Sequence, residues 1–408
     1  MTVPSILPQS MSDGLELKTI DNSISRGAAT RFSVNAISTE EGLSSLEEDW
    51  NRLGETAESP NVFTTFDWFR AWNRHRSHET RRSLRRPNVL VLKKDGAIAG
   101  ISPLIYRETS RFGMAVRKME FVGREADYND LVLGNDAAAQ SVAIAEFLAE
   151  THDHWDLVDL RDLRGTGETI AQIESALSNA GLIYRSLPEE ERCPFLPIDA
   201  PSSEIVSSRS RSIRRMADGL HTLRKKQHRL ERMSAGGLRV RIIENPQSEQ
   251  GLLQKLIALE NQKHVHGELS PPFISVYPEV FQSLFDSLGP RGWIYIAMME
   301  MGDQPIGWRL GFRCGKKLWD FLTAYNHAYS RLSPGTMLVN AVLDYGYSHG
   351  YTEHDFLRGE ESYKMQWSTG FHQTYRLLIW NRRWISQARA LMYLDLKRVI
   401  YRVFGRTS

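Results

Sequence analysis

Three short apolar runs in the second half of the chain predict a meander of antiparallel strands. The runs cover residues 293–299, 306–312 and 318–325, and they are rich in aromatic and β-branched side chains, a composition typical of strands. Gly302-Asp303 and Gly315-Lys316 separate the runs and suit tight turns. We therefore expect these segments to pair with one another in one sheet.

The segment after this meander predicts a loop, a helix and two more strands. Pro334 suits the first turn of a helix, and the apolar residues that follow it recur at helical spacing as far as about His349. Gly350 is placed to end this helix. Residues 353–357 and 373–380 are apolar runs of strand length, so we expect two further buried strands there.

The first half of the chain predicts a similar order of elements. Residues 39–160 contain two amphipathic helices, a hairpin around Lys94-Asp95-Gly96, a further strand, a helix and a buried strand. The same order recurs in residues 247–357, and an internal repeat of this kind indicates a duplicated unit. We therefore expect residues 39–186 and 238–380 to fold as two related units of mixed α/β structure.

The polar flanks and the basic segments complete the expected domain organisation. The expected parts are a disordered tail at 1–30, a first domain at 31–200, a basic linking helix at 201–236, a second domain at 237–381 and a basic amphipathic helix at 382–408. The linking helix has no interleaved aromatic side chains for stacking bases, so we expect it to be solvated or to attract an anionic cofactor. The terminal helix has two open alternatives, namely packing or oligomerisation, and contact with an anionic membrane surface.

Composition is that of a soluble globular protein. The 408 residues are 41% hydrophobic and 25% charged, with a net charge of +2. Cys193 and Cys314 lie far apart and lack the spacing of a zinc site, so we expect no metal. No apolar stretch reaches the roughly 20 residues that a membrane span needs, and no signal peptide is visible. We expect a cytoplasmic protein that contacts membranes at most peripherally, through residues 382–408.

The junction between the third strand of the meander and the following helix is the first candidate binding site. A helix N-terminus presents unpaired N–H groups and the positive end of the helix dipole, which suits a phosphate group. Gly335 lets a ligand approach the backbone closely. Residues 325–338 therefore form a candidate phosphate-binding loop.

Four sequence strings resemble one family of enzymes. They are SPGTMLVNAVLDYGYSHG, HDFLRGEESYKMQW, FTTFDWFRAW and EADYNDLVL. Together they resemble the CelD-type, or cellulose-biosynthesis-type, acetyltransferases, which are GNAT-fold proteins related to the FemAB aminoacyltransferases. The resemblance covers residues 39–380 and implies tandem GNAT-like domains in a FemAB-like arrangement.

The resemblance implies an acyltransferase that uses acetyl-CoA or another acyl-CoA. The implied acceptor is an amino sugar, a polysaccharide precursor or another small amine in envelope, exopolysaccharide or cellulose biosynthesis. RLSPGT departs from the usual GNAT phosphate motif, Q/R-x-x-G-x-G/A, which leaves two alternatives. One is a FemAB-like ligase that takes an amino acid from aminoacyl-tRNA, and the other is a non-catalytic accessory protein of exopolysaccharide assembly.

Candidate site residues follow from the strand ends and from the resemblance. Asp355 and Glu360 are candidate bases, Tyr325 and Tyr363 are candidate acids, and the resemblance assigns Lys364 to phosphates or developing charge. The candidate substrate contacts are Arg358, Tyr363, Tyr128 and Asp130. Two alternatives stay open: residues 128–130 could form a turn whose side chains hydrogen-bond to their own backbone, and the residues around Glu360 could form an ion-paired turn. The expected cofactor-binding residues are Arg331, Ser333, Pro334, Gly335, Thr336, Met337 and Leu338.

Overall fold

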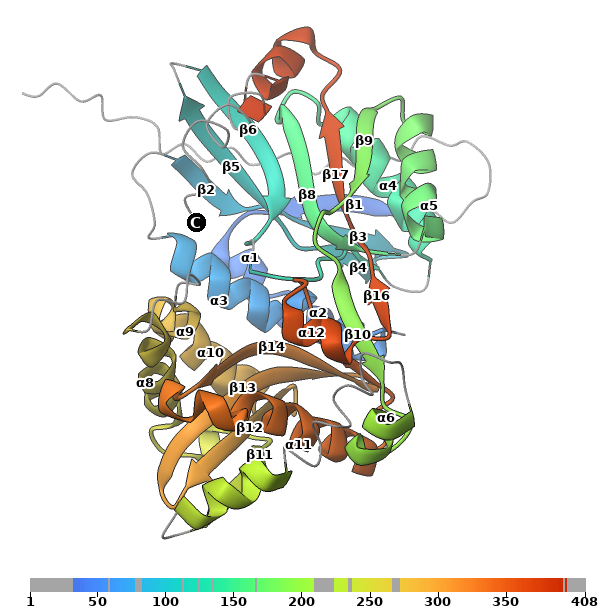
Figure 1. Ribbon diagram of the computed structural model, residues 1–408. Coiled ribbons are helices and arrows are strands. Elements are labelled where there is room, and N and C mark those ends of the chain that lie inside the picture. Colours follow the sequence, from blue (N-terminus) through green and yellow to red (C-terminus); the bar gives the residue numbers. More distant parts are fainter. Residues whose placement is uncertain are drawn as a thin grey trace, which may run out of the picture.

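Figure 1 shows the computed structural model, in which two sheet-containing halves lie one above the other. The structure describes residues 32–57, 59–77, 83–111, 114–123, 125–133, 136–165, 167–208, 224–233, 237–265, 272–391 and 393–394. The expected tail at 1–30, much of the linking segment at 201–236 and the end of the terminal helix lie outside these residues.

The first half contains two sheets with helices packed around them. The four-stranded sheet has the order β1-β3-β4-β7, and the six-stranded sheet has the order β2-β5-β6-β8-β17-β9. The strands are β1 (Ser33–Ile37), β2 (Ser83–Pro87), β3 (Val89–Lys94), β4 (Ala97–Ser102), β5 (Leu104–Arg111), β6 (Met114–Phe121), β7 (Val132–Leu133), β8 (Leu157–Arg164), β9 (Ile183–Pro188) and β17 (Thr374–Trp380). The helices are α1 (Glu40–Ser44), α2 (Glu47–Thr56), η1 (Val62–Thr64), α3 (Phe66–Ser77), α4 (Ala137–Glu150) and α5 (Gly167–Asn179).

The second half is built on one seven-stranded sheet with the order β11-β12-β13-β14-β15-β10-β16. Its strands are β10 (Cys193–Pro197), β11 (Leu238–Ile243), β12 (Ile294–Met301), β13 (Gln304–Cys314), β14 (Lys317–Tyr325), β15 (Glu353–Asp355) and β16 (Gly370–His372). Its helices are α6 (Ser202–Ser208), η2 (Pro246–Ser248), α8 (Leu252–Val265), α9 (Phe273–Val276), α10 (Pro278–Leu288), η3 (His327–Leu332), α11 (Pro334–Ser348) and α12 (Ser362–Trp367). The described residues 224–233 form one more helix.

The two halves repeat one pattern of strand pairing, as expected for a duplicated unit. In each half a run of antiparallel strands is followed by one parallel pair, β6 with β8 and β14 with β15. Two antiparallel pairs follow, β8-β17-β9 in the first half and β15-β10-β16 in the second. The chain therefore folds as two related mixed α/β units.

The units exchange one strand each, which corrects the expected domain boundaries. β17, expected in the second unit, lies between β8 and β9 of the first, because Leu377 and Ile379 pack into the first unit's core. In return, β10 comes from the first half of the chain and lies between β15 and β16 of the second unit. Separating residues 31–200 from residues 237–381 would therefore remove β17 from the six-stranded sheet and β10 from the seven-stranded sheet.

An aromatic core joins the two units. The Phe63 ring stacks on Trp319 with centroids 5.6 Å apart, and the Trp68 ring lies edge-on to Phe312 at 6.0 Å. The aromatic side chains of η1 and α3 therefore serve packing, and they fix the two units relative to each other.

The described part of the terminal segment packs on the first unit. Residues 384–391 are helical, and Ala390 and Tyr393 are buried against Val116 and Leu157. Trp384 on the outer side of this helix is 77% exposed. Within the described residues, no helix is long and apolar enough to span a membrane.

Candidate functional site

The parallel strands β14 and β15 diverge in the second unit. They pair only where Lys317–Trp319 runs beside Glu353–Asp355. Beyond this point β14 continues six residues to Tyr325, about 20 Å at the usual rise of a strand. Among the described residues, this part of β14 has a strand partner only in β13. Its other edge can accept an extended chain that carries amide groups.

The far end of β14 leads through η3 to the N-terminus of α11. Ser333, the residue before the helix, has a left-handed backbone (φ 58°), which is unfavourable for a non-glycine residue and is often found at functional sites. The Ser333 side chain does not cap the helix but accepts a hydrogen bond from Lys226 Nζ at 2.8 Å. This arrangement places a positive charge beside the N–H groups of the first helical turn.

The seven expected cofactor-binding residues lie together here but differ in exposure. Arg331 is exposed at the end of η3, and Gly335 and Thr336 are partly exposed in the first turn of α11. Pro334, Met337 and Leu338 are buried in the second unit, so their side chains serve packing. Leu338 also packs against β13 at Gly307, where its Cδ1 lies 3.2 Å from the position that a Cβ would take.

A buried hydrogen bond joins the two units where β14 and β15 part. Tyr128 Oη donates to Asp355 Oδ2 at 2.8 Å, and the Leu357 N–H donates to Asp355 Oδ1 at 2.8 Å. Burial raises the pKa of Asp355 to about 6. Burial, reinforced by the charge of Asp355, holds the pKa of Tyr128 well above its ordinary value. Both Asp355 oxygens are thus occupied, and its carboxylate positions Tyr128.

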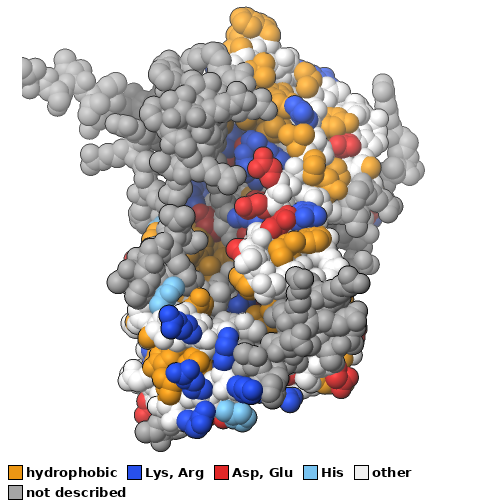
Figure 2. Space-filling model, viewed as in Figure 1, with side chains coloured by type: hydrophobic (Ala, Val, Ile, Leu, Met, Phe, Trp, Pro, Cys, Tyr) orange, Lys and Arg blue, Asp and Glu red, His pale blue; other side chains and the backbone are white. Residues whose placement is uncertain are grey.

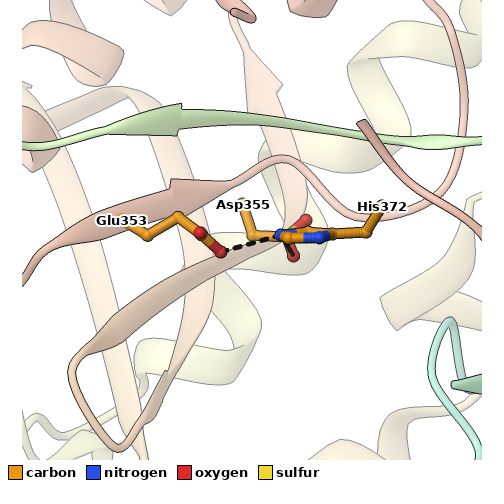
Figure 3. Close-up of side chains that lie close together, drawn as sticks. All are labelled: Glu353, Asp355 and His372. Atoms are coloured by element: carbon orange, nitrogen blue, oxygen red, sulfur yellow. Dashed lines mark hydrogen bonds and ion pairs between the residues drawn. The ribbon is translucent and has the colours of Figure 1, made fainter. Parts of the chain in front are cut away.

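Glu353, Asp355 and His372 bring three potential metal ligands together, and their ligand atoms lie within 4.8 Å of one another (Figure 3). His372 Nε2 lies 3.0 Å from Glu353 Oε1 and 3.9 Å from Asp355 Oδ2. Lys317 Nζ donates to the same Glu353 oxygen at 2.8 Å. The ammonium group of Lys317 therefore already neutralises Glu353, and a divalent metal would have to displace it.

Arg358 and Lys364 stabilise the turn after β15. Arg358 pairs with Asp162 at 2.8 Å and with Asp127 at 3.2 Å, and both carboxylates belong to the first unit. Lys364 is buried and donates to the Arg358 carbonyl oxygen at 2.6 Å. Its ammonium also pairs with Glu361 at 3.0 Å. Lys364 therefore fixes the position of Arg358.

Asp130 is the carboxylate whose properties best suit a general base. Burial raises its pKa to about 7, near the value that an efficient base needs at neutral pH. The residue as a whole is nevertheless partly exposed. The opposing charge comes from Arg164, whose guanidinium lies 5.6 Å from the rings of both Tyr128 and Trp319. Arg164 therefore links Asp130 to Trp319, the last residue of β14 that pairs with β15.

Glu360 does not join the other candidates. Gly359 has a φ of 112°, and the turn it makes directs Glu360 to the surface, where it forms two hydrogen bonds with Arg192 at 2.8 and 3.1 Å. The expected role as a base is therefore not supported by its position, whereas the ion-paired alternative describes it well.

The two tyrosines expected as acids lie at different ends of the diverging strands. Tyr325 ends β14, and its ring carbon Cε1 lies 3.8 Å from where a Cβ of Gly335 would be. Tyr363 lies over the buried Arg309, with 5.5 Å between the guanidinium and the ring centroid. Tyr325 thus borders the candidate cofactor loop, and Tyr363 borders an ionic cluster.

Three side chains of that ionic cluster were not identified from the sequence. Arg309 and Asp320 form a buried ion pair between β13 and β14, and His354 Nε2 lies 3.7 Å from Asp320 Oδ2. Arg309 and Asp320 lie on neighbouring strands and His354 lies further along the chain, so the strand register brings the three together. Lys226 is similar, because the basic composition of its helix was visible but its contact with Ser333 was not.

Comparisons with known proteins agree with this architecture. Residues 217–365 match a protein family described as an acetyltransferase (GNAT) domain. No curated protein matches the sequence. The match supports an acyltransferase and the GNAT part of the resemblance, while the finer likeness to CelD-type enzymes stays a prediction.

Solved structures show the same fold at low sequence identity. FemX is 10% identical, with a TM-score of 0.56 over 85% of this chain and 98% of FemX. A conserved protein of unknown function from Bacteroides thetaiotaomicron is 8% identical, with a TM-score of 0.52 over 85% of this chain and all of that one (100%). The TM-score is lower, 0.45, for the C-terminal domain of a putative lysylphosphatidylglycerol synthetase from Agrobacterium fabrum, which is 12% identical over 73% of this chain and 85% of that one. The GNAT-domain match, the repeated strand pairing and the likeness to the first two structures together indicate a tandem GNAT-like fold.

Proposed function

We propose that this protein transfers an acyl group from acyl-CoA, most readily acetyl-CoA, to an amine. The observation that carries the proposal is the contact of Lys226 with Ser333 at the head of α11. It brings a cation to a helix N-terminus at one end of a strand edge that can hold the amide-bearing arm of coenzyme A. The pyrophosphate of the donor binds at α11, and the thioester reaches the point where β14 and β15 part.

The reaction follows from the groups at that point. The amine nitrogen attacks the thioester carbonyl, the carbon–sulfur bond breaks, and coenzyme A leaves as the thiol after taking up a proton. Asp130, with its pKa of about 7, accepts the proton of the amine directly or through water. Tyr128, held by Asp355, orients the acceptor from the first unit, and Arg358 lines the turn opposite.

The acceptor belongs to the same proposal. We infer a small amine, such as an amino sugar or a polysaccharide precursor, in the assembly of an envelope or extracellular polysaccharide. The exposed Trp384 on the terminal helix offers a peripheral membrane contact, which would bring the enzyme to a membrane-bound acceptor.

Lys226→Ala tests the proposal. We expect acetyl-CoA affinity to fall roughly tenfold or more, because a charge-assisted hydrogen bond typically contributes about 1.5–3 kcal/mol. Lys225→Ala is the matched control, because Lys225 is exposed on the same helix and should leave the affinity unchanged. Isothermal titration calorimetry measures both. Equal losses in the two variants would show a diffuse charge effect, and no loss in Lys226→Ala would reject the site.

A second candidate function is aminoacyl transfer from aminoacyl-tRNA. Two observations favour it, namely the shared fold with FemX and the exposed basic side chains on residues 224–233. The two candidates differ in their donor. If the second function holds, tRNA should bind with a steep dependence on salt concentration and should compete with acetyl-CoA. If the first function holds, acetyl-CoA should support transfer without any tRNA.

A further inference from the structure

A small pocket in the first unit is lined by arginine side chains from four different elements. It has a volume of about 50 Å³ and lies where β2, β5, β6 and β8 of the six-stranded sheet meet α3. The basic side chains that line it are Arg76, Arg85, Arg107 and Arg161. Figure 2 shows Lys and Arg side chains beside acidic ones in a recessed area of the upper half of the molecule.

The ion pairs around this pocket leave an excess of positive charge. Glu120 and Asp159 are two of its lining residues. Four cations share these two carboxylates: Arg107 and Lys118 at Glu120, and Lys118, Arg161 and Arg376 at Asp159. Two positive charges therefore have no carboxylate of their own within this network.

The remaining two arginines bring further donors to the same wall. Arg76 pairs with Glu125, and Arg85 donates to the carbonyl oxygen of Val122, which also lines the pocket. Burial, the largest influence, would raise the pKa of Glu120 and Asp159, but the surrounding cations together outweigh it and hold both pKa values below their ordinary range. The two carboxylates thus stay ionised near neutral pH, and the excess of positive charge around the pocket remains.

We infer that this pocket binds a phosphate group of the acceptor, an assignment that rests on the proposed acyl transfer. Uncompensated charge in a partly buried site is costly, and a dianionic phosphate supplies the two missing negative charges. Guanidinium groups bind phosphate oxygens through paired N–H donors. The pocket has room for about three or four water molecules, and this number is similar to the number of oxygen atoms in one phosphate group.

The position of the pocket connects it to the reacting groups. Asn129 lines the pocket, and its backbone N–H donates to the Asp162 carbonyl oxygen at 2.8 Å. Its neighbours in sequence are Tyr128, which contacts Asp355, and Asp130, the proposed base. An acceptor whose phosphate occupies the pocket therefore lies along the segment that carries the base.

Arg161→Gln and Arg107→Gln test this inference. Inorganic phosphate and pyrophosphate serve as probes in calorimetric titrations, with acetate as the monoanionic comparison. We expect saturable phosphate binding that falls at least tenfold in each variant. Arg185→Gln, an exposed arginine on β9, is the matched control and should bind as the unchanged protein does. Arg161→Lys keeps the positive charge but lacks the paired N–H donors, so it should lose only part of the phosphate affinity. This variant also provides a test if a glutamine variant does not fold.

Acetyl-CoA separates the acceptor assignment from the proposed function itself. Its affinity should be unchanged in Arg161→Gln, and phosphate should bind equally well when acetyl-CoA is present. The inference would be overturned if acetyl-CoA displaced phosphate, or if Arg161→Gln lost affinity for acetyl-CoA. Either result would show that the pocket binds the acyl donor. Absence of phosphate binding would overturn the inference as well. Phosphate binding without any acetyl transfer would instead refute only the proposed function and the acceptor role.

Discussion

Asp130→Asn is expected to reduce acyl transfer by roughly 100-fold to 10,000-fold, the usual contribution of a positioned general base. The substitution keeps the shape of the side chain and removes its ability to accept a proton. In the unchanged protein, kcat/KM should rise with pH through about 7, because Asp130 acts only when it is ionised and burial raises its pKa to about 7. The variant should lose this dependence. Initial rates measured from pH 5.5 to 9 give both results.

The same substitution should stabilise the fold at high pH. An unfolded aspartate loses its proton near pH 4, whereas folded Asp130 keeps its proton up to about pH 7. The folded state binds more protons in this window, so stability falls as pH rises from about 4 to 7. Asp130→Asn avoids this loss, which is at most roughly 4 kcal/mol for about three pKa units and is reduced by solvent screening.

Unfolding curves at pH 4 and pH 8 check the sign of this effect. The two proteins should be equally stable at pH 4, and the variant should be more stable at pH 8. Asp303→Asn, in an exposed turn of the second unit, is the control and should change neither rate nor stability. A fully active Asp130→Asn variant would exclude Asp130 as the base, whatever its stability.

Gly335→Val is expected to abolish acyl-CoA binding while the protein stays folded. A Cβ at Gly335 would meet only the ring of Tyr325, at 3.8 and 3.9 Å, which is ordinary van der Waals contact. Valine is also a better helix former than glycine, so unfolding should not begin at a lower temperature. The branched side chain would, however, cover the N–H groups that a pyrophosphate must reach, and losing such a donor typically costs about 2.7–4 kcal/mol.

A graded pair of variants makes this second result specific. Gly335→Ala adds only the Cβ and should weaken acetyl-CoA binding less than Gly335→Val does. Thermal-shift titrations with acetyl-CoA measure the order, because a ligand that binds only the folded state raises the unfolding temperature. Equal shifts in the unchanged protein and both variants would place the donor elsewhere.

Local pattern was enough to predict most elements and the loop that leads into α11. The turn at Lys94-Asp95-Gly96 is present, with positive φ angles of 51° at Asp95 and 82° at Gly96. α11 begins at Pro334, as expected, and ends one residue before His349. These features depend on short-range rules for turns and helix ends, which the sequence displays directly.

Features that depend on distant partners could not be predicted in the same way. The apolar run at residues 373–380 indicated a strand, but a strand pattern does not specify its neighbours, and β17 pairs in the first unit. Glu360 follows a strand end, yet the backbone at Gly359 turns it toward Arg192. Asp130 was a candidate contact, but its raised pKa arises from burial, which only the tertiary structure shows.

Binding of an acyl-CoA donor at the head of α11 can be measured by calorimetric titration of the full chain with acetyl-CoA, with deacylated tRNA titrated into a second sample. We expect one acetyl-CoA site per chain, at the helix N-terminus where Lys226 contacts Ser333, and no competition from tRNA. The absence of heat with acetyl-CoA, or displacement of acetyl-CoA by tRNA, would show that the donor does not bind there.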